Sequence, residues 1–208
     1  LAVRKIQGHW HVHPLTGILP KVRVNKLYAD ILAKDNTCAK NESIKEKLQE
    51  ARWLVRNMEQ RDQTIFAVGQ AIVARQNEYF DHGEIAIKPM TLADIAGDID
   101  MHESTVSRVV SSKYLVCPGG LKPMKMFFTS HVHTSAGDSC SATSVKAMIQ
   151  AIVNDEPTGE PYSDHKLAEL LSRQGVRIAR RTVSKYRQSI GLRSFELRRQ
   201  DSRCAEAA

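Results

Sequence analysis

The order of hydrophobic and polar positions changes several times along the chain, and each change predicts a different element. Near the start, Trp10 and Val12 alternate with histidines, and Val22 and Val24 alternate again after Pro20. A period of two is typical of a strand with one buried face. Residues 1 to about 30 are therefore predicted to be extended.

From about Asn41 to Phe80 the apolar positions recur every three to four residues, as they do on one face of a helix. This run contains no proline, and its only glycine is Gly69. We expect two helices that pack on one another, with a possible break near Arg61 and Asp62.

Residues 91–110 form the first of two helix-turn-helix patterns. Asp100 occupies the predicted turn, where a left-handed backbone favours Gly but also tolerates Asp. The second helix is predicted to start near His102, with its valines on one side and small hydroxyl side chains on the other. The apolar side holds Val106, Val109 and Val110, and the polar side holds Ser104, Ser107, Arg108 and Ser111. An ordinary helical hairpin with a polar outer face is the alternative interpretation.

The second helix-turn-helix pattern lies near the C-terminus. Its first helix is predicted to start at Ser163 as N-cap and to end at Gly175. Its second helix is predicted over 179–190, with Gly191 as the stop. On a helical wheel, one arc faces the core and holds Ala179, Val183, Tyr186 and Ile190. The opposite arc holds Arg180, Arg181, Ser184, Arg187 and Gln188, whose side chains suit bidentate contacts to guanine and adenine.

Basic residues concentrate in the same part of the chain. Residues 163–203 hold eleven Lys and Arg against four Asp and Glu, so the segment carries +7, which equals the net charge of the whole chain. Such asymmetry predicts a polyanionic partner for the C-terminal part.

The four cysteines are scattered, which argues against structural zinc and favours free thiols in a reducing cytoplasm. No stretch of about 18 apolar residues predicts a membrane span, so we expect no membrane partner. The chain begins at Leu1 rather than Met. We expect it to be part of a longer protein.

Motifs for catalysis are missing from the sequence. A recombinase or nuclease would need clustered carboxylates, and the chain has no P-loop, no H-E-x-x-H motif and no acidic triad. We therefore expect no enzymatic activity and no cofactor. His9, His11 and His13 could bind a metal on one strand face, but a solvated strand face explains them equally well, and we expect no metal site.

The helix predicted over residues 179–190 gives the chain a family resemblance. Residues 179–188 read A-R-R-T-V-S-K-Y-R-Q, which resembles the RpoN box, A-R-R-T-V-A-K-Y-R-E, of the sigma-54 (sigma-N) transcription initiation factors. Only Ser184 and Gln188 differ. The central pattern over 101–109, M-H-E-S-T-V-S-R-V, also resembles that family. The resemblance extends from Gly8 to Gly191.

The resemblance implies a mainly α fold with minor β structure at the N-terminus. It implies a helical bundle that contains the core-binding region and a central helix-turn-helix, and a separate C-terminal helix-turn-helix domain. The expected divisions are a core RNA polymerase-binding region (1–84), the central helix-turn-helix (85–128), a linker rich in Ser, Thr and Gly (129–143), the C-terminal DNA-binding domain (144–193) and a flexible tail (194–208).

The resemblance also implies a function and partners. Family members bind core RNA polymerase and direct it to promoters with minus-24 and minus-12 elements, so double-stranded promoter DNA and core polymerase are the expected partners. An AAA+ activator ATPase acts on the full-length protein. Because the Gln-rich N-terminal segment that responds to this activator is absent from the chain, we expect promoter and polymerase binding without activator-gated control. The expected location is the cytoplasm, on the nucleoid.

Two sets of DNA-binding residues follow from the resemblance. The minus-24 set is Arg180, Arg181, Thr182, Ser184, Lys185, Tyr186, Arg187 and Gln188. The minus-12 set is His102, Glu103, Ser104, Thr105, Ser107 and Arg108.

One segment departs from the family pattern. After the central motif the family usually has T-P-R-G-x-F-x-L-K-x-F-F, whereas residues 117–128 read C-P-G-G-L-K-P-M-K-M-F-F. Pro123 stands where a strand residue is expected, and proline cannot donate a ladder hydrogen bond. We therefore expect an altered hairpin here.

Two questions stay open: whether residues 41–80 contact polymerase or only support the fold, and whether the chain is instead a repressor that acts without polymerase.

Overall fold

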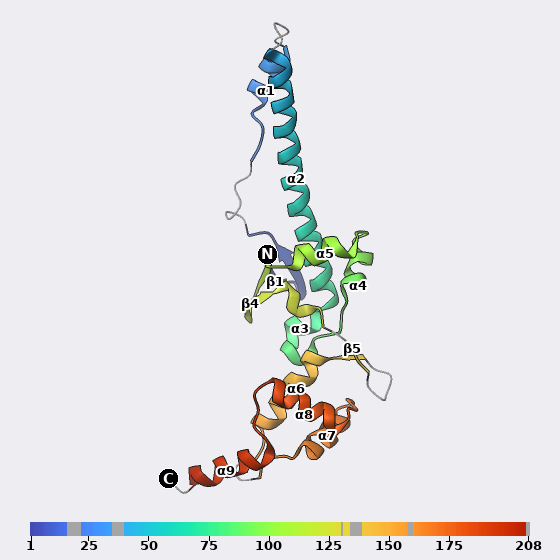
Figure 1. Ribbon diagram of the computed structural model, residues 1–208, viewed down its shortest axis with the longest axis vertical. Coiled ribbons are helices and arrows are strands. Elements are labelled where there is room, and N and C mark those ends of the chain that lie inside the picture. Colours follow the sequence, from blue (N-terminus) through green and yellow to red (C-terminus); the bar gives the residue numbers. More distant parts are fainter. Residues whose placement is uncertain (16–21, 35–39, 130, 134–138, 158–159, 207–208) are drawn as a thin grey trace.

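The computed structural model describes residues 1–15, 22–34, 40–129, 131–133, 139–157 and 160–206 (Figure 1). The fold is mainly helical with a small sheet that includes the N-terminal strands, as predicted. The described residues form two hydrophobic cores. One lies beside the sheet and the end of a long helix, and the other lies among the C-terminal helices.

Four short strands form one sheet in the order β2-β1-β3-β4. Strands β1 (Ala2–Ile6) and β2 (His9–His13) are antiparallel and are joined by a turn at Gln7 and Gly8, both with positive φ. Strand β3 (Tyr114–Cys117) runs parallel to β1 and antiparallel to β4 (Gly120–Pro123). Residues 114–123 therefore form a hairpin, which contains the unusual Pro123. Pro123 is tolerated because it is the last residue of an edge strand, where no further strand needs its amide.

The first helical region differs from the prediction. Residues 22–25 are not a strand, and helix α1 (Lys26–Lys34) follows directly, because the Asn25 side chain accepts a hydrogen bond from the Leu27 amide (3.0 Å). Helix α2 (Lys40–Arg75) is continuous through Arg61 and Asp62, so the predicted break there is wrong. Neither residue interrupts helical hydrogen bonding, unlike proline.

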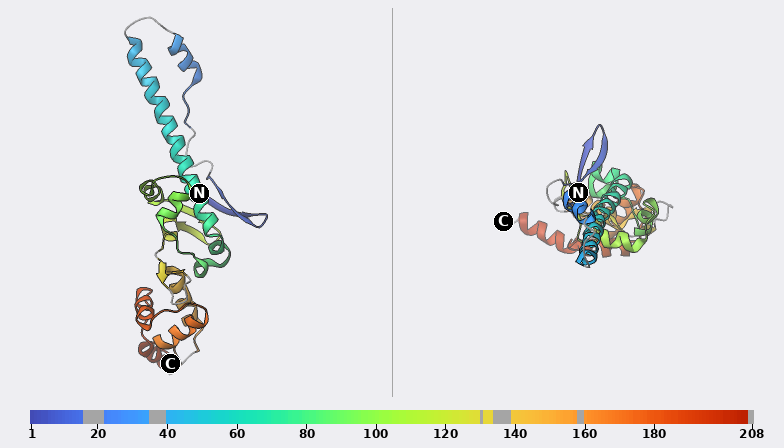
Figure 2. Two further views of the ribbon diagram at one scale, coloured as in Figure 1. Left: turned by 90° about the vertical axis from the view of Figure 1, so that its right-hand side faces the viewer. Right: turned by 90° about the horizontal axis from the view of Figure 1, so that it is seen from above.

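Helix α2 projects from the rest of the molecule with α1 beside it, and its C-terminal third packs on the sheet (Figures 1 and 2). Gly69 lies at this contact, where a side chain would collide with Leu1. Helix α3 (Asn77–His82) and the short 3₁₀ helix η1 (Gly83–Ala86) follow α2. Instead of a helical bundle, the N-terminal part combines one long helix with a sheet.

The first core includes residues from distant parts of the chain. Val3 and Val12 of the sheet pack with Ile72 of α2, Ile95 of helix α4 (Leu92–Asp98) and Val106 of helix α5 (Glu103–Val110). The 3₁₀ helix η2 (Met124–Phe127) adds Phe127, whose ring lies edge-on to Tyr79 (5.0 Å between centroids). A single core thus spans the ranges 1–84 and 85–128.

The second core joins helix α6 (Ala142–Asn154), helix α7 (Asp164–Arg173) and helix α8 (Arg180–Ser189). The side chains of Val145, Ile149, Leu167, Leu171 and Val183 are fully buried in it. The range 129–143, predicted as a linker, contains strands β5 (His131–His133) and β6 (Ser139–Ser141), which pair with each other.

The range 194–208 contains helix α9 (Phe195–Glu206) rather than the flexible tail that we expected. Arg198 attaches this helix to the second core. Its guanidinium donates to the carbonyl oxygen of Tyr162 (2.7 Å) and lies 3.4 Å from the carboxylate of Glu156. An ion pair between distant residues cannot be read from the local composition on which the prediction rested.

Candidate nucleic-acid interface

Helices α7 and α8 form a helix-turn-helix whose ends match the sequence prediction. The Ser163 hydroxyl accepts a hydrogen bond from the Lys166 amide (3.3 Å) and caps α7. Gly175, with φ +91°, follows the last residues of α7, and Gly191, with φ +77°, follows α8. A local side chain therefore caps the start of α7, and a glycine follows the end of each helix.

The outer face of α8 is basic and exposed. Arg180, Arg181, Lys185 and Gln188 are exposed, while Thr182 and Ser184 are partly buried. The helix contains no acidic residue. Lys146 of α6 adds a further positive charge, with its ammonium 5.7 Å from the centre of the Tyr186 ring. Long cationic side chains on one helical face are the arrangement that reads the major groove.

Arg187 does not belong to this face, so its predicted outward orientation is wrong. It is only 5% exposed. Its Nε and Nη2 donate to the Asp164 carboxylate at 2.8 and 3.3 Å, and Nη1 donates to the carbonyl oxygen of Leu192 at 2.8 Å. Because Arg187 lies four residues after the buried Val183, only about 40° separates them on the helix. That spacing is the signal that could have placed it correctly.

Two further positions show where the helical-wheel prediction fails and where it holds. Ala179, predicted to face the core, is exposed because it is the N-cap, with an extended backbone (ψ 146°), so the helical wheel does not apply to it. Tyr186 is partly buried and packs against the second core, as the wheel predicts. Its ring fixes the helix from beneath rather than extending from the exposed face.

Helices α4 and α5 form the other predicted helix-turn-helix. Thr91 and Asp94 make a reciprocal capping box at the start of α4. Asp100 has φ +51°, the left-handed backbone expected in the turn. His102 caps α5, since its Nδ1 accepts a hydrogen bond from the Ser104 amide (3.2 Å).

The exposed face of α5 carries the polar residues predicted for it. His102, Glu103, Ser104, Thr105 and Arg108 are exposed, and Ser107 is partly buried. Val106 and Val110 are buried on the opposite side, and Val109 packs against the first core. This face is less basic than that of α8, because Arg108 is its only permanent cation and Glu103 opposes it.

An ion pair attaches the α4–α5 unit to the long helix. Arg75 at the end of α2 donates to both carboxylate oxygens of Asp98, with Nη2–Oδ1 at 2.8 Å. This side-chain hydrogen bond is the main reason that the pKa of Asp98 lies below its usual value. The unit is thus held by a charged contact as well as by the first core.

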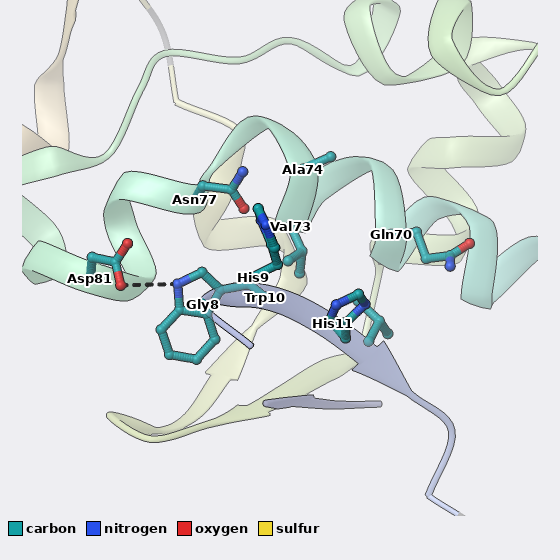
Figure 3. A pocket seen from close by; sticks show the side chains of 10 residues that line it. Gly8, His9, Trp10, His11, Gln70, Val73, Ala74, Asn77 and Asp81 are labelled. Carbon is teal, nitrogen blue, oxygen red and sulfur yellow. Dashed lines mark hydrogen bonds between the residues drawn. The ribbon is translucent and has the colours of Figure 1, made fainter. Parts of the chain in front are cut away.

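The predicted histidine positions lie on the sheet beside α2. In the part of the chain that the structure describes, no group of three or more His, Cys, Asp and Glu side chains is arranged to hold a metal ion. His9 and His11 line an open cavity of about 330 Å³ between β2 and α2, together with Gln70 and Asn77 (Figure 3). Beside them, the Trp10 indole donates to Asp81 (3.1 Å). Of the described helices, none is both long and apolar enough to cross a membrane.

Comparison with known proteins identifies the family. A family model described as "Sigma-54, DNA binding domain" matches residues 41–200. The chain belongs to the sigma-54 family. The RNA polymerase sigma-54 factor of Vibrio anguillarum is 44% identical over 192 residues, which cover 92% of this chain and 39% of that protein. The factor of Escherichia coli K12 is 41% identical over 198 residues, covering 95% and 42%.

This sigma-54 chain therefore spans about two fifths of the length of these relatives. It is also similar to a solved structure of Aquifex aeolicus sigmaN bound to promoter DNA, with a TM-score of 0.59 and 29% identity. That match covers 95% of this chain and 59% of the other. Over nearly all of its length, this chain therefore resembles a protein whose structure has been solved with promoter DNA bound.

Two residues that hold distant segments together were not found from the sequence. Asp164 counted only as one acid in a basic segment, although it holds Arg187. Gln76 is fully buried, where its side-chain amide bridges the backbone of Lys88. Each partner is distant in sequence, and no local pattern connects them.

Proposed function

We propose that this chain is the promoter-binding part of a sigma-54 transcription initiation factor. In this proposal α8 reads the minus-24 element and α5 reads the minus-12 element. The observation that carries it is the exposed, acid-free basic face of α8, at the positions of the family's RpoN box. Transcription would then start where both helices find their elements in the right order.

The side chains of α8 divide into three roles under this proposal. Arg180 and Arg181, exposed and adjacent to the helix start, are the candidates for bidentate contacts to guanine. Lys185, Thr182, Ser184 and Gln188 contact phosphates or further base edges. Tyr186 and Arg187 act by positioning the helix, since both pack or pair inward.

The face of α5 has a different chemistry and hence a different proposed role. Ser104, Thr105 and Ser107 are small, so the helix can approach the DNA closely, and Arg108 reaches a base edge or phosphate. His102 and Glu103 lie at the N-terminus of α5, where the first backbone N–H groups of the helix point outward. Glu103 disfavours phosphate and can accept a hydrogen bond from a cytosine amino group.

Core RNA polymerase is the proposed protein partner of the N-terminal part. Large apolar side chains stay exposed along α1 and α2, including Leu27 (73%), Tyr28 (68%) and Trp53 (66%). Exposed apolar surface of this extent is typical of a protein-binding surface. Contact with an AAA+ activator is proposed only for the full-length protein.

DNase footprinting on a promoter with minus-24 and minus-12 elements, with and without core polymerase, tests the proposal. Protection of both elements is expected, and polymerase should join the complex. Protection of only one element would contradict the two-helix model. A repressor would give the footprint but would not co-purify with core polymerase, and that result would remove the initiation function while keeping DNA binding.

A further inference from the structure

Aromatic and amide side chains share the open cavity between β2 and α2. His9, Trp10 and His11 line it from consecutive positions of β2. Gln70 of α2 and Asn77 of α3 line it from the helical side (Figure 3). The volume of about 330 Å³ lies at the lower end of the range for cavities that hold a small molecule. The cavity therefore combines the size and the mixture of side chains of a small ligand site.

The Trp10 ring is held in place by the fold. Its Nε1 donates a hydrogen bond to the Asp81 carboxylate (3.1 Å), and its ring centroid lies 5.4 Å from that of Phe80. The Lys5 ammonium lies 5.4 Å from the centre of the same ring. Because these contacts fix the indole in advance, a ligand that lies against it loses little affinity to the ordering of this side chain.

The other polar side chains of the cavity are not used by the fold. His9, His11, Gln70 and Asn77 are exposed, and none of them forms a side-chain hydrogen bond with another residue that the structure describes. An amide group can both donate and accept, and so can a neutral imidazole. Val73 adds buried apolar surface beneath them. The cavity thus offers flat rings and free hydrogen-bonding groups together.

The charges around the cavity narrow the class of ligand. Among the described residues that line it, the only permanent charge is Asp81, which is already bonded to Lys5 and Trp10. No third His, Cys, Asp or Glu side chain of the described chain joins His9 and His11 in an arrangement that could hold a metal ion. The best match is therefore a flat, uncharged molecule with donors and acceptors along its edge.

We propose that this cavity binds a nucleobase. The rings of β2 contact the faces of the base, since stacking on aromatic side chains accepts any base. Gln70 and Asn77 bind its edge, and such amides pair best with adenine. A free nucleoside and an unpaired base of a nucleic-acid strand present the same chemistry. The inference goes beyond the proposed function, because it does not need α5 or α8 to bind DNA.

Trp10 provides a direct signal from the cavity. The chain has two tryptophans, so in the full chain with Trp53→Phe the remaining indole N–H resonance belongs to Trp10. Adenosine, a deoxyadenosine strand of about ten nucleotides and an abasic strand of the same length are added in turn. The deoxyadenosine strand should shift the Trp10 resonance, and the abasic strand should not.

The response to adenosine distinguishes the two sources of the base. A shift with adenosine as well as with the deoxyadenosine strand would show that the base alone is sufficient. A shift with the strand only would identify the ligand as an unpaired base within a nucleic acid. An equal shift with the abasic strand would assign binding to phosphate and overturn the inference. No shift with adenosine or the deoxyadenosine strand, or a shift only with core polymerase, would overturn it too.

Substitutions in β2 test the stacking contacts. His9→Ala and His11→Ala should each weaken binding of the deoxyadenosine strand by roughly 5-fold or more, because each removes a ring. His13→Ala is the matched control, since His13 is exposed on the same strand but does not line the cavity. It should bind like the wild type. Unchanged binding in both His9→Ala and His11→Ala would refute the nucleobase site.

A change at Asn77 tests recognition of the base edge. Asn77→Ala should reduce the preference for a deoxyadenosine strand over a thymidine strand, because the amide that distinguishes the bases is lost. An unchanged preference would contradict the assigned contact.

Promoter binding separates this inference from the proposed function. The substitutions at His9, His11 and Asn77 should leave the affinity for promoter duplex DNA unchanged, since these residues lie outside α5 and α8. A wild-type chain that binds adenosine but does not prefer promoter to scrambled duplex would refute the proposed function alone. A chain that prefers promoter DNA but gives no Trp10 shift would refute the nucleobase site alone.

Discussion

Arg187 of α8 and Asp164 of α7 form a two-point ion pair that is almost excluded from solvent, with side-chain exposures of 6% and 17%. The two hydrogen bonds measure 2.8 and 3.3 Å, and the same guanidinium donates to the carbonyl oxygen of Leu192. One side chain thus joins the start of α7, helix α8 and the chain that follows α8. The ion pair therefore connects α8, which carries Arg180 and Arg181, to α7.

Substitution of Arg187 should act through stability. In Arg187→Ala the Asp164 carboxylate is left half-buried without its partner, which costs about 3 kcal/mol of unfolding free energy for a buried pair. Binding to promoter DNA and to scrambled DNA should decrease by the same factor, because both losses follow from the fraction of the protein that is unfolded. Urea denaturation and binding assays measure both effects, and Asp164→Asn in a double-mutant cycle isolates the pair. A stable Arg187→Ala that loses only minus-24 preference would restore Arg187 as a DNA contact.

Arg180→Ala and Arg181→Ala should have the opposite profile. Both side chains are exposed, so the unfolding free energy should change by less than about 0.5 kcal/mol. If each makes a bidentate contact to the minus-24 guanines, its removal should cost about 1–3 kcal/mol of binding to that element and little on scrambled DNA. Competition binding on matched and scrambled duplexes measures the difference. Equal loss on both duplexes would show that the arginine contacts a phosphate.

The sequence predicts helix ends well where the determining residue is local. Ser163, Gly175 and Gly191 act within one turn of the helices that they cap or stop, and Asp100 fixes its turn by its own backbone. Burial on a helical wheel is also local, so Val183 and Val106 were placed correctly. The wheel failed for Arg187 because a charged residue was assumed to face outward, while its partner lies 23 residues away.

Long-range arrangement could not be predicted in the same way. The pairing of β1 with β3 joins Ala2 to Val116, and no periodic pattern connects two short strands so far apart. The length of α2 was underestimated because its outer half has no core to pack on, so its apolar positions do not mark a single continuous face. Attachment of α9 depends on Arg198 reaching Glu156 and is likewise a tertiary contact.

Affinity for DNA should decrease steeply as salt increases. Each phosphate contact made by a lysine or arginine releases condensed counterions, so log K falls against log salt by about 0.9 per contact. Lys185→Ala, if Lys185 binds a phosphate, should reduce the slope by about 1 and weaken specific and scrambled DNA alike. Titrations at several salt concentrations measure the slope. Lys47→Ala, on the distant part of α2, is the control and should leave it unchanged.

Acid should weaken the attachment of α4 to α2. The hydrogen bond from Arg75 lowers the pKa of Asp98, an effect that desolvation partly opposes. Because the folded-state pKa lies below the unfolded one, the pair stabilises the fold above about pH 4, and this contribution is lost as the pH falls further. Asp98→Asn should therefore be less stable than the wild type at pH 7, and the difference should shrink as the pH falls below about 4. Denaturation at several pH values tests this, and a constant difference would assign the effect to packing.

Gln76→Ala should weaken the attachment of the segment around Lys88, which follows η1. The Gln76 side chain is fully buried and satisfies both backbone groups of Lys88. Its loss removes two hydrogen bonds, each of which contributes about 0.5–1.5 kcal/mol net. Hydrogen exchange should show faster exchange at the Lys88 amide than in the wild type, while amides in α7 and α8 keep their protection. Gln76→Glu is the matched variant: its carboxylate can accept from the Lys88 amide but cannot donate to the carbonyl, so it should restore amide protection only in part. Wild-type protection at Lys88 in Gln76→Ala would show that this bridge does not hold the segment around Lys88.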